Sequence, residues 1–387
     1  MEPAPGFSKF VDGRCRADEE RAREVQGTTA AGAEERRVAW ADVAKGVCIL
    51  LVVLWHVLMK HYLQIDWQIK SPVQGAWGAL GEQLLPLRMP LFFAVSGFFA
   101  VRAVQRPWPV LARTKVAKFF YLYALWLVIH TVVLAFVPDF GTERADGPLK
   151  FLAQLTITPS NLWYLSALAL YFVIAKAVQR VPVWAVLGAA FALSATASAG
   201  LLDVPGNRGG VYQNLLFFLA GLYGKSLIEE LAARASWRRL LLLGVPYAGL
   251  LAVVELFDAK TWFGLWPVVS GVAIVLGVTA AGLLARVEWL SNGLASIGRR
   301  TLPIYVLHMP LLALVHLALI KPLSAAGPAT QWIVSVAEPV VLTAFLAWLC
   351  LVLYRYLPKA LFELPFGLGV SRSVAPSHRR TSPLSSR

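Results

Sequence analysis

Long apolar runs recur along almost the whole chain, and they constrain its fold more than any other feature. A helix needs about 20 mostly apolar residues to cross the hydrocarbon core of a bilayer. Inside lipid, a spanning segment must satisfy its own backbone hydrogen bonds, and a helix does this. Ten runs have this length and character: 41–60, 83–102, 116–137, 161–179, 182–202, 211–228, 239–257, 262–285, 301–320 and 332–356. The sequence therefore predicts an all-α, polytopic transmembrane helical bundle with about ten spans.

The composition supports a membrane protein and excludes an ordinary soluble domain. Only 15% of the 387 residues are charged and 58% are hydrophobic, whereas a soluble domain has about 25% charged residues. The three cysteines, Cys15, Cys48 and Cys350, show no spacing pattern. Their arrangement indicates neither a disulfide framework nor a metal site.

The distribution of Lys and Arg predicts how the spans are oriented. When the ten runs are threaded alternately through a membrane, 27 basic residues fall on the side that holds both termini and seven on the other. Cytoplasmic loops carry such an excess, so both termini are predicted to be cytoplasmic. The basic residues lie between apolar runs and form no single patch, which argues against a nucleic-acid partner despite the net charge of +14.

Three regions follow from this threading. Residues 1–38 contain no apolar core and are expected to form a disordered cytoplasmic tail. Residues 39–358 form the membrane domain. Residues 359–387 are expected to form a second cytoplasmic tail.

The first run, KGVCILLVVLWH at 45–56, has an ionisable residue at each end. Lys45 and His56 share one helix face about 16 Å apart along the axis, and Asp42 lies where it can pair with Lys45. Lys45 could snorkel to cytoplasmic headgroups while His56 lies at a wet outer edge. Alternatively, both residues line a functional route through the bundle.

The second run places another cation at similar depth to His56. Arg88 lies near the predicted outer end, between Pro86 and Pro90. A charge inside a membrane usually faces a cavity or a partner. Arg88 is therefore a candidate site residue, although outward snorkelling is an alternative.

Two further segments contribute polar or aromatic candidates. Tyr305 and His308 share a face of the ninth run, at a depth expected to be closer to Lys45 than to His56. His308 could also be a hydrogen-bonded core residue. Trp163 and Tyr164 open the fourth run at the outer face, where they fit either an interfacial aromatic belt or the wall of a sugar site.

Four segments together resemble the membrane acyltransferase-3 family, and most of all its fucose 4-O-acetylase-like branch. They are WADVAKGVCILLVVLWH at 40–56, RMPLFFAVSGFF at 88–99, LWYLSAL at 162–168 and IGRRTLPIYVLH at 297–308. They occur in family order across the membrane domain. The resemblance implies an integral membrane O-acyltransferase of the bacterial cytoplasmic (inner) membrane. Such an enzyme moves an acyl group, most simply acetyl from acetyl-CoA, from a cytoplasmic acyl-CoA to a hydroxyl of an extracytoplasmic glycan or lipid-linked saccharide.

The same resemblance suggests roles for individual residues. His56 matches the motif histidine and is expected to act as general base, or as a nucleophile that forms an acyl-imidazole. Arg88 is expected to stabilise an oxyanion or the donor. His308 matches the histidine that closes the last motif. Lys45 stands where the family more often has Arg, which is not interchangeable with Lys, and it is expected to lie on the donor side near the CoA phosphates.

No bound cofactor and no metal are expected, and acyl-CoA is a co-substrate. A different class of function is also compatible with ten spans and buried charges. A transporter or flippase for a glycan or lipid intermediate would share both features, although such proteins often contain internal repeats and paired broken helices, which this sequence does not show.

Overall fold

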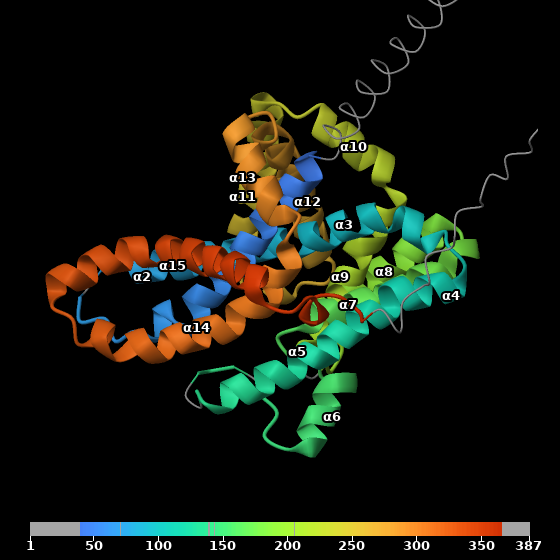
Figure 1. Ribbon diagram of the computed structural model, residues 1–387. Coiled ribbons are helices and arrows are strands. Elements are labelled where there is room, and N and C mark those ends of the chain that lie inside the picture. The colour runs from blue at the N-terminus through green and yellow to red at the C-terminus, as the bar shows by residue number, and fades with distance from the viewer. Residues whose placement is uncertain (1–38, 70, 138–139, 143, 205, 366–387) are drawn as a thin grey trace, which may run out of the picture.

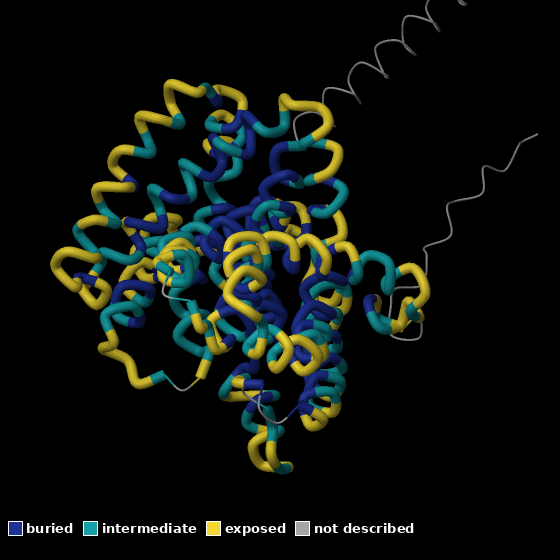
Figure 2. The backbone as a smooth tube through the Cα atoms, turned by 90° about the vertical axis from the view of Figure 1, so that its left-hand side faces the viewer, coloured by how far each residue is buried: buried dark blue, intermediate teal, exposed yellow. Residues whose placement is uncertain are grey.

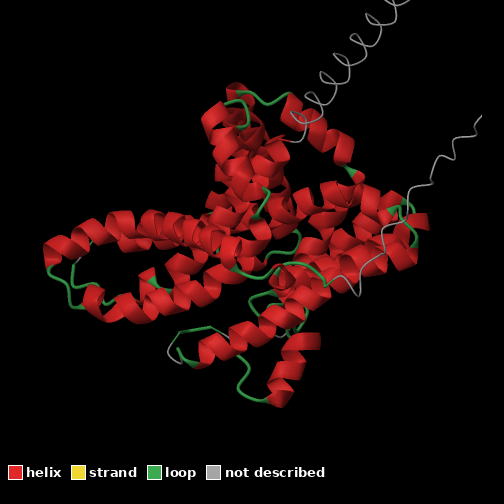
Figure 3. Cartoon of the chain, in the orientation of Figure 1, coloured by secondary structure: helices red, strands yellow, loops and turns green. Residues whose placement is uncertain are grey.

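The computed structural model describes residues 39–365 except 70, 138–139, 143 and 205. Throughout these residues the regular secondary structure is helical (Figure 3), which confirms the all-α prediction. The predicted tail 1–38, and 366–387 of the second tail, lie outside the described residues.

The first helix covers residues 39–60. The later elements, in chain order, are η1 (Tyr62–Gln64), α2 (Val73–Gln83), α3 (Leu85–Val104), α4 (Trp108–Leu111), the π-helical segment η2 (Ala112–Val116), α5 (Ala117–Ala135), α6 (Pro148–Thr156), α7 (Trp163–Ala177), η3 (Val178–Arg180), α8 (Val183–Ser198), α9 (Arg208–Tyr223), α10 (Lys225–Ala233), α11 (Trp237–Leu256), η4 (Ala259–Thr261), α12 (Leu265–Leu284), α13 (Glu288–Gly298), α14 (Thr301–Ser324), α15 (Pro328–Tyr356) and η5 (Lys359–Leu361).

Seven helical segments of the described chain are long and apolar enough to cross a membrane. They are Ala39–Gln64, Val73–Val104, Trp108–Ala135, Trp237–Leu256, Leu265–Leu284, Thr301–Ser324 and Pro328–Tyr356. Each corresponds to one of the ten predicted runs. The protein is therefore a multi-pass membrane protein.

The other three predicted spans correspond to shorter helices. The helices α7, α8 and α9 contain 15, 16 and 16 residues. A helix of 16 residues is about 24 Å long, which is less than the roughly 30 Å of a hydrocarbon core. The structure thus confirms the helices but not the count of ten spans, and the span count and the cytoplasmic termini stay predictions.

The central helix of the bundle is α3, which crosses the middle of the molecule in Figure 1. It packs against α9, α12 and α7. A Cβ at Gly97 would collide with the carbonyl oxygen of Phe218, and one at Gly221 with that of Ala94. Because both residues are glycine, the backbones of α3 and α9 lie in direct contact.

Apolar side chains cover much of the outside of the bundle. Figure 2 shows buried segments concentrated at the centre and exposed ones around them. Large apolar residues stand exposed along α11 and α15, among them Leu241, Val245, Ile333, Val341 and Trp348. Soluble proteins rarely expose contiguous apolar surface on this scale, so these helix faces are the surface that contacts lipid.

Candidate active site

The register between the first helix and the segment α13–α14 is set by two glycines. A Cβ at Gly298 would collide with the backbone carbonyl of Asp42, and one at Gly46 with that of Leu294. The two backbones therefore touch at this level. His56 lies ten residues beyond Gly46, about 15 Å further along the first helix. His308 lies ten residues beyond Gly298, past the turn at Arg299 and Arg300 and inside α14.

This register brings the two histidines together. The ring centroids of His56 and His308 lie 5.2 Å apart with an interplanar angle of 36°. His308 is buried and His56 is half-buried. The pair forms the centre of the candidate active site.

The sequence placed His308 at the depth of Lys45, and this expectation is wrong. It assumed that each apolar run starts at the membrane surface. In the structure α13 precedes α14 and packs against the first helix at Asp42, so α14 starts further along the bundle axis than the run suggests. The sequence predicted Lys45 and His308 at one depth and His56 and Arg88 at another. In the structure, His56, His308 and Arg88 form one cluster.

The orientation of the His308 ring is fixed by its own helix. Its Nδ1–H donates to the carbonyl oxygen of Ile304, 3.0 Å away. A neutral imidazole that donates from Nδ1 presents a lone pair at Nε2. Nε2 is buried and has no hydrogen-bond partner among the described residues, and the same is true of Nδ1 of His56. Buried polar atoms normally have partners, so these two nitrogens have hydrogen-bonding capacity that the protein itself leaves unused.

Arg88 completes the cluster from α3. Its guanidinium carbon lies 4.2 Å from the ring centroid of Trp55, the residue before His56. The side chain is buried, with 4% of its surface exposed, and makes no ion pair with any carboxylate in the described chain. Arg88 also interacts electrostatically with His56. A buried cation without an anionic partner, held next to an imidazole, is suited to stabilise negative charge that develops during a reaction.

Lys45 lies at the other end of the first helix, as the sequence predicted. Its Nζ is 2.8 Å from Oδ1 of Asp42 and 4.6 Å from the ring centroid of Phe99. Arg299 approaches the same carboxylate at 3.8 Å. The ion pair between Asp42 and Lys45 is thus observed, and it lies about 16 Å from His56 along the helix axis.

The aromatic candidates lie around the histidine pair and are held by contacts with neighbouring helices. Tyr305 donates to the carbonyl of Asn161 at 3.1 Å, and its ring centroid lies 6.1 Å from that of His308. Tyr164 is buried, and its hydroxyl lies 2.8 Å from Oγ of Ser96. Trp163 is half-buried and packs against Phe93. The suggestion that Trp163 and Tyr164 contact the acceptor stays a prediction.

A second ionisable cluster, just past the end of the first helix, was not predicted from the sequence. Nδ1 of His61 lies 3.1 Å from Nδ1 of His316, and Nε2 of His61 lies 3.5 Å from Oε1 of Glu338. A carboxylate within an apolar run is itself a functional signal, and Glu338 carried that signal in the tenth run.

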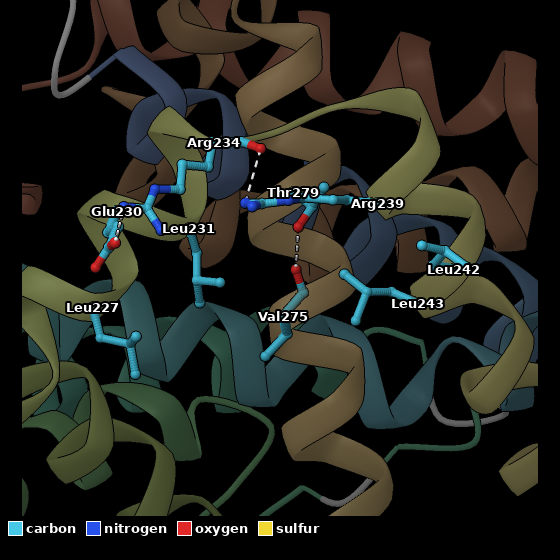
Figure 4. A pocket seen from close by; sticks show the side chains of 9 residues that line it. All are labelled: Leu227, Glu230, Leu231, Arg234, Arg239, Leu242, Leu243, Val275 and Thr279. Carbon is cyan, nitrogen blue, oxygen red and sulfur yellow. Dashed lines mark hydrogen bonds and ion pairs between the residues drawn. The ribbon is translucent and has the colours of Figure 1, made fainter.

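A pocket of about 410 Å³ lies between α10, α11 and α12 (Figure 4). Its two arginines are already engaged: Arg234 pairs with Glu230 at 2.7 Å, and Arg239 donates to the carbonyl of Arg234 at 3.1 Å. Leucines form most of the remaining wall. None of the predicted site residues lines this pocket. Its carboxylate, Glu230, pairs with Arg234, and the Thr279 hydroxyl donates to the carbonyl of Val275.

Comparison with known proteins decides the family. Residues 38–355 match the acyltransferase domain family Acyl_transf_3. The chain belongs to this acyltransferase family. The membrane acyltransferase-3 resemblance of the four segments is thereby confirmed, and with it the expected enzyme class, an acyltransferase that moves groups other than aminoacyl groups.

This acyltransferase also resembles an Escherichia coli (strain K12) protein described as inner membrane protein YcfT. The two are 25% identical over 319 residues, which cover 76% of this chain and 84% of the relative. No solved structure gives a significant match. The match to the family spans the first helix, α3, α7 and α14, and therefore every element that contributes to the site.

Proposed function

We propose that this acyltransferase moves an acetyl or related acyl group from cytoplasmic acyl-CoA to a hydroxyl of an extracytoplasmic glycan or lipid-linked saccharide. The protein lies in the bacterial inner membrane, as its E. coli relative's description suggests. The observation that carries the proposal is the pair His56 and His308, 5.2 Å apart beside the buried Arg88. A base and an unpaired cation are the groups that transfer of an acyl group to a hydroxyl requires.

In the direct form of the reaction, an imidazole accepts the proton of the acceptor hydroxyl as its oxygen attacks the thioester carbonyl. The C–O bond forms and negative charge develops on the carbonyl oxygen, which the guanidinium of Arg88 stabilises. The C–S bond then breaks, and the leaving thiolate takes the proton to give free CoA. His308 is suited to the role of base because Ile304 holds its Nδ1–H and leaves Nε2 as the acceptor.

In the two-step form, a nitrogen of His56 attacks the thioester carbonyl, the C–S bond breaks, and CoA leaves as a thiolate that takes up the imidazole proton. The acceptor hydroxyl oxygen then attacks the acyl-imidazole, and the C–N bond breaks to give the ester and free His56. His308 would act as base in the second step. Both forms use His308 as the base and Arg88 to stabilise the oxyanion. His56 is a packing partner of His308 in the direct form and the nucleophile in the two-step form, so an acyl-imidazole detected on His56 would distinguish the two forms.

Lys45 supports the donor side of this proposal. An acyl-CoA carries several phosphate charges, and the Lys45 ammonium lies at the predicted cytoplasmic end of the first helix, 4.6 Å from the Phe99 ring centroid. Asp42 holds Lys45 at this position. Lys45 would therefore bind the donor and not take part in the chemistry.

Transfer of label from acetyl-CoA tests the proposed function. Membranes that contain the protein should move radiolabelled acetyl from acetyl-CoA to a saccharide, and membranes with His56→Ala should not, at equal protein level. Mass spectrometry of surface glycans from a deletion strain identifies the acceptor. Movement of an unmodified saccharide across the membrane, without labelling, would instead support a transporter or flippase.

A further inference from the structure

A second pocket, of about 370 Å³, opens at the predicted outer side of the bundle next to the candidate active site. Its volume is within the range of about 300–1,000 Å³ that small-molecule sites usually have. Trp55 and Pro86 form the wall closest to the histidine pair. Trp55 also contacts the guanidinium of Arg88 at 4.2 Å, so one residue joins the wall of the pocket to the proposed oxyanion-stabilising residue.

The pocket offers an aromatic surface and an unused hydrogen-bond donor. Trp266 of α12 lines it together with Trp55. The indole Nε1 of Trp266 is buried and has no hydrogen-bond partner in the described part of the chain. A buried indole N–H usually finds a partner, so Trp266 has an unused hydrogen-bond donor in the wall of the pocket.

The rim of the pocket carries an excess of negative charge. Nζ of Lys260 lies 3.1 Å from Oε2 of Glu82 and 3.7 Å from Oε1 of Glu255. Gln83 donates to Oε1 of Glu255 at 3.2 Å. These contacts join α2, η4 and α11 around the opening. The carboxylates raise the pKa of Lys260, which keeps it protonated, so two carboxylates and one ammonium remain at the rim.

We infer that this pocket binds the saccharide acceptor and that its rim selects neutral or amino-bearing saccharides over anionic ones. The inference rests on the proposed function for the identity of the ligand as an acceptor. Indole rings stack on the C–H faces of a sugar, and carboxylate and amide oxygens accept hydrogen bonds from its hydroxyls. A uronic acid or a phosphorylated sugar would meet the uncompensated carboxylate and bind more weakly.

Equilibrium binding of three probes tests this inference without acyl-CoA. The full-length protein in nanodiscs is titrated with phenyl β-D-glucoside, phenyl β-D-glucosaminide and phenyl β-D-glucuronide, and binding is followed by saturation-transfer NMR. The neutral and amino glycosides should bind at least about tenfold more tightly than the glucuronide. Replacement of both carboxylates, Glu82→Gln with Glu255→Gln, should reduce this preference to about twofold.

Aromatic variants test the pocket itself. Trp266→Ala should weaken glucoside binding about tenfold or more, and Trp266→Phe, which retains a ring, by about threefold. Trp262→Ala is the matched control, because Trp262 precedes α12 but does not line the pocket; it should leave binding within about twofold. Equal binding of glucuronide and glucoside, or equal effects of the two alanine variants, would overturn the inference.

The same titration separates this inference from the proposed function. His56→Ala should retain glycoside binding while it loses label transfer from acetyl-CoA. Glycoside binding without any label transfer in the unaltered protein would contradict the proposed function and leave the pocket standing. If the unaltered protein transfers label but glycoside binding is unchanged in Trp266→Ala, the proposed acceptor pocket is wrong and the proposed function is not affected.

Discussion

The ring centroids of His56 and His308 lie 5.2 Å apart, although the two helices that carry them are far apart in the sequence. Arg88 lies beside them, stacked on Trp55. The close packing of Gly46 and Gly298 joins the first helix to α13, which leads into α14, the helix of His308. We therefore expect acyl transfer to be slowed by substitution of the reacting groups and also by substitution of the glycines that pack the helices together.

Loss of the His308 base should slow acyl transfer strongly. His308→Gln retains a polar side chain but cannot accept a proton near neutral pH, and removal of a general base costs about 10²–10⁴-fold in rate. Label transfer from acetyl-CoA at saturating acceptor measures this loss.

His130→Gln is the control for that variant. His130 is also buried in the bundle, but its Nε2 donates to the carbonyl of Val306 at 2.9 Å, and a Gln amide can replace this contact. Its rate should stay within about threefold of the unaltered protein, because a neutral hydrogen bond contributes only about 1 kcal/mol. Equal losses in the two variants would mean that His308 has a structural role only.

The guanidinium of Arg88 should be needed beyond its charge. Arg88→Lys preserves a cation but loses the planar group that stacks on Trp55. We expect kcat to fall about 10²-fold, which is the scale of losing one oxyanion donor, with a smaller change in KM for acyl-CoA. Steady-state kinetics with full activity in this variant would reduce Arg88 to a structural anchor.

Substitution of Gly298 should disturb the alignment of the two histidines. Gly298→Ala places a methyl group against the carbonyl of Asp42, and overpacking of this kind costs about 1–3 kcal/mol. Both the melting temperature in detergent and the rate of label transfer should fall.

Gly293→Ala provides the comparison on the same helix, α13. No atom lies within 4 Å of a Cβ at Gly293, and Ala is favoured over Gly in a helix by about 0.5–1 kcal/mol. The melting temperature should stay unchanged or rise, with full activity. If Gly298→Ala behaved in the same way, the packing argument for the register would be wrong.

Lys45 should affect donor binding and not the chemical step. Lys45→Gln removes the ammonium that is proposed to contact CoA phosphates. KM for acetyl-CoA should rise about tenfold with kcat nearly unchanged, because the lost contact stabilises the bound donor and the transition state equally. A fall in kcat at constant KM would place Lys45 in the reaction itself.

Sequence patterns predicted the apolar helices well because length and hydrophobicity decide what can cross lipid. They do not decide whether the three shorter helices, α7, α8 and α9, also cross the membrane. The helix α9, for example, buries Phe217 and Phe218 against other helices, and a run buried in protein has the same composition as one buried in lipid.

The candidate site was predictable residue by residue but not in its arrangement. The spacing of Lys45 and His56 follows from one helix, and the structure retains it. The contact of His56 with His308, and the stack of Arg88 on Trp55, depend on how separate helices pack. Periodicity within a helix contains no information on the starting depth of its neighbour, so the level of His308 was misjudged.

A double-variant comparison tests the central claim most directly. Rates of acetyl transfer from acetyl-CoA are measured for His56→Ala, His308→Ala and the double variant, with equal amounts of each protein in nanodiscs. Residues that act as one catalytic unit are strongly non-additive. If His56 and His308 act together, the double variant is no slower than the slower single variant. Rate losses that multiply, or a single variant with the full rate of the unaltered protein, would show that the two histidines do not form one catalytic unit.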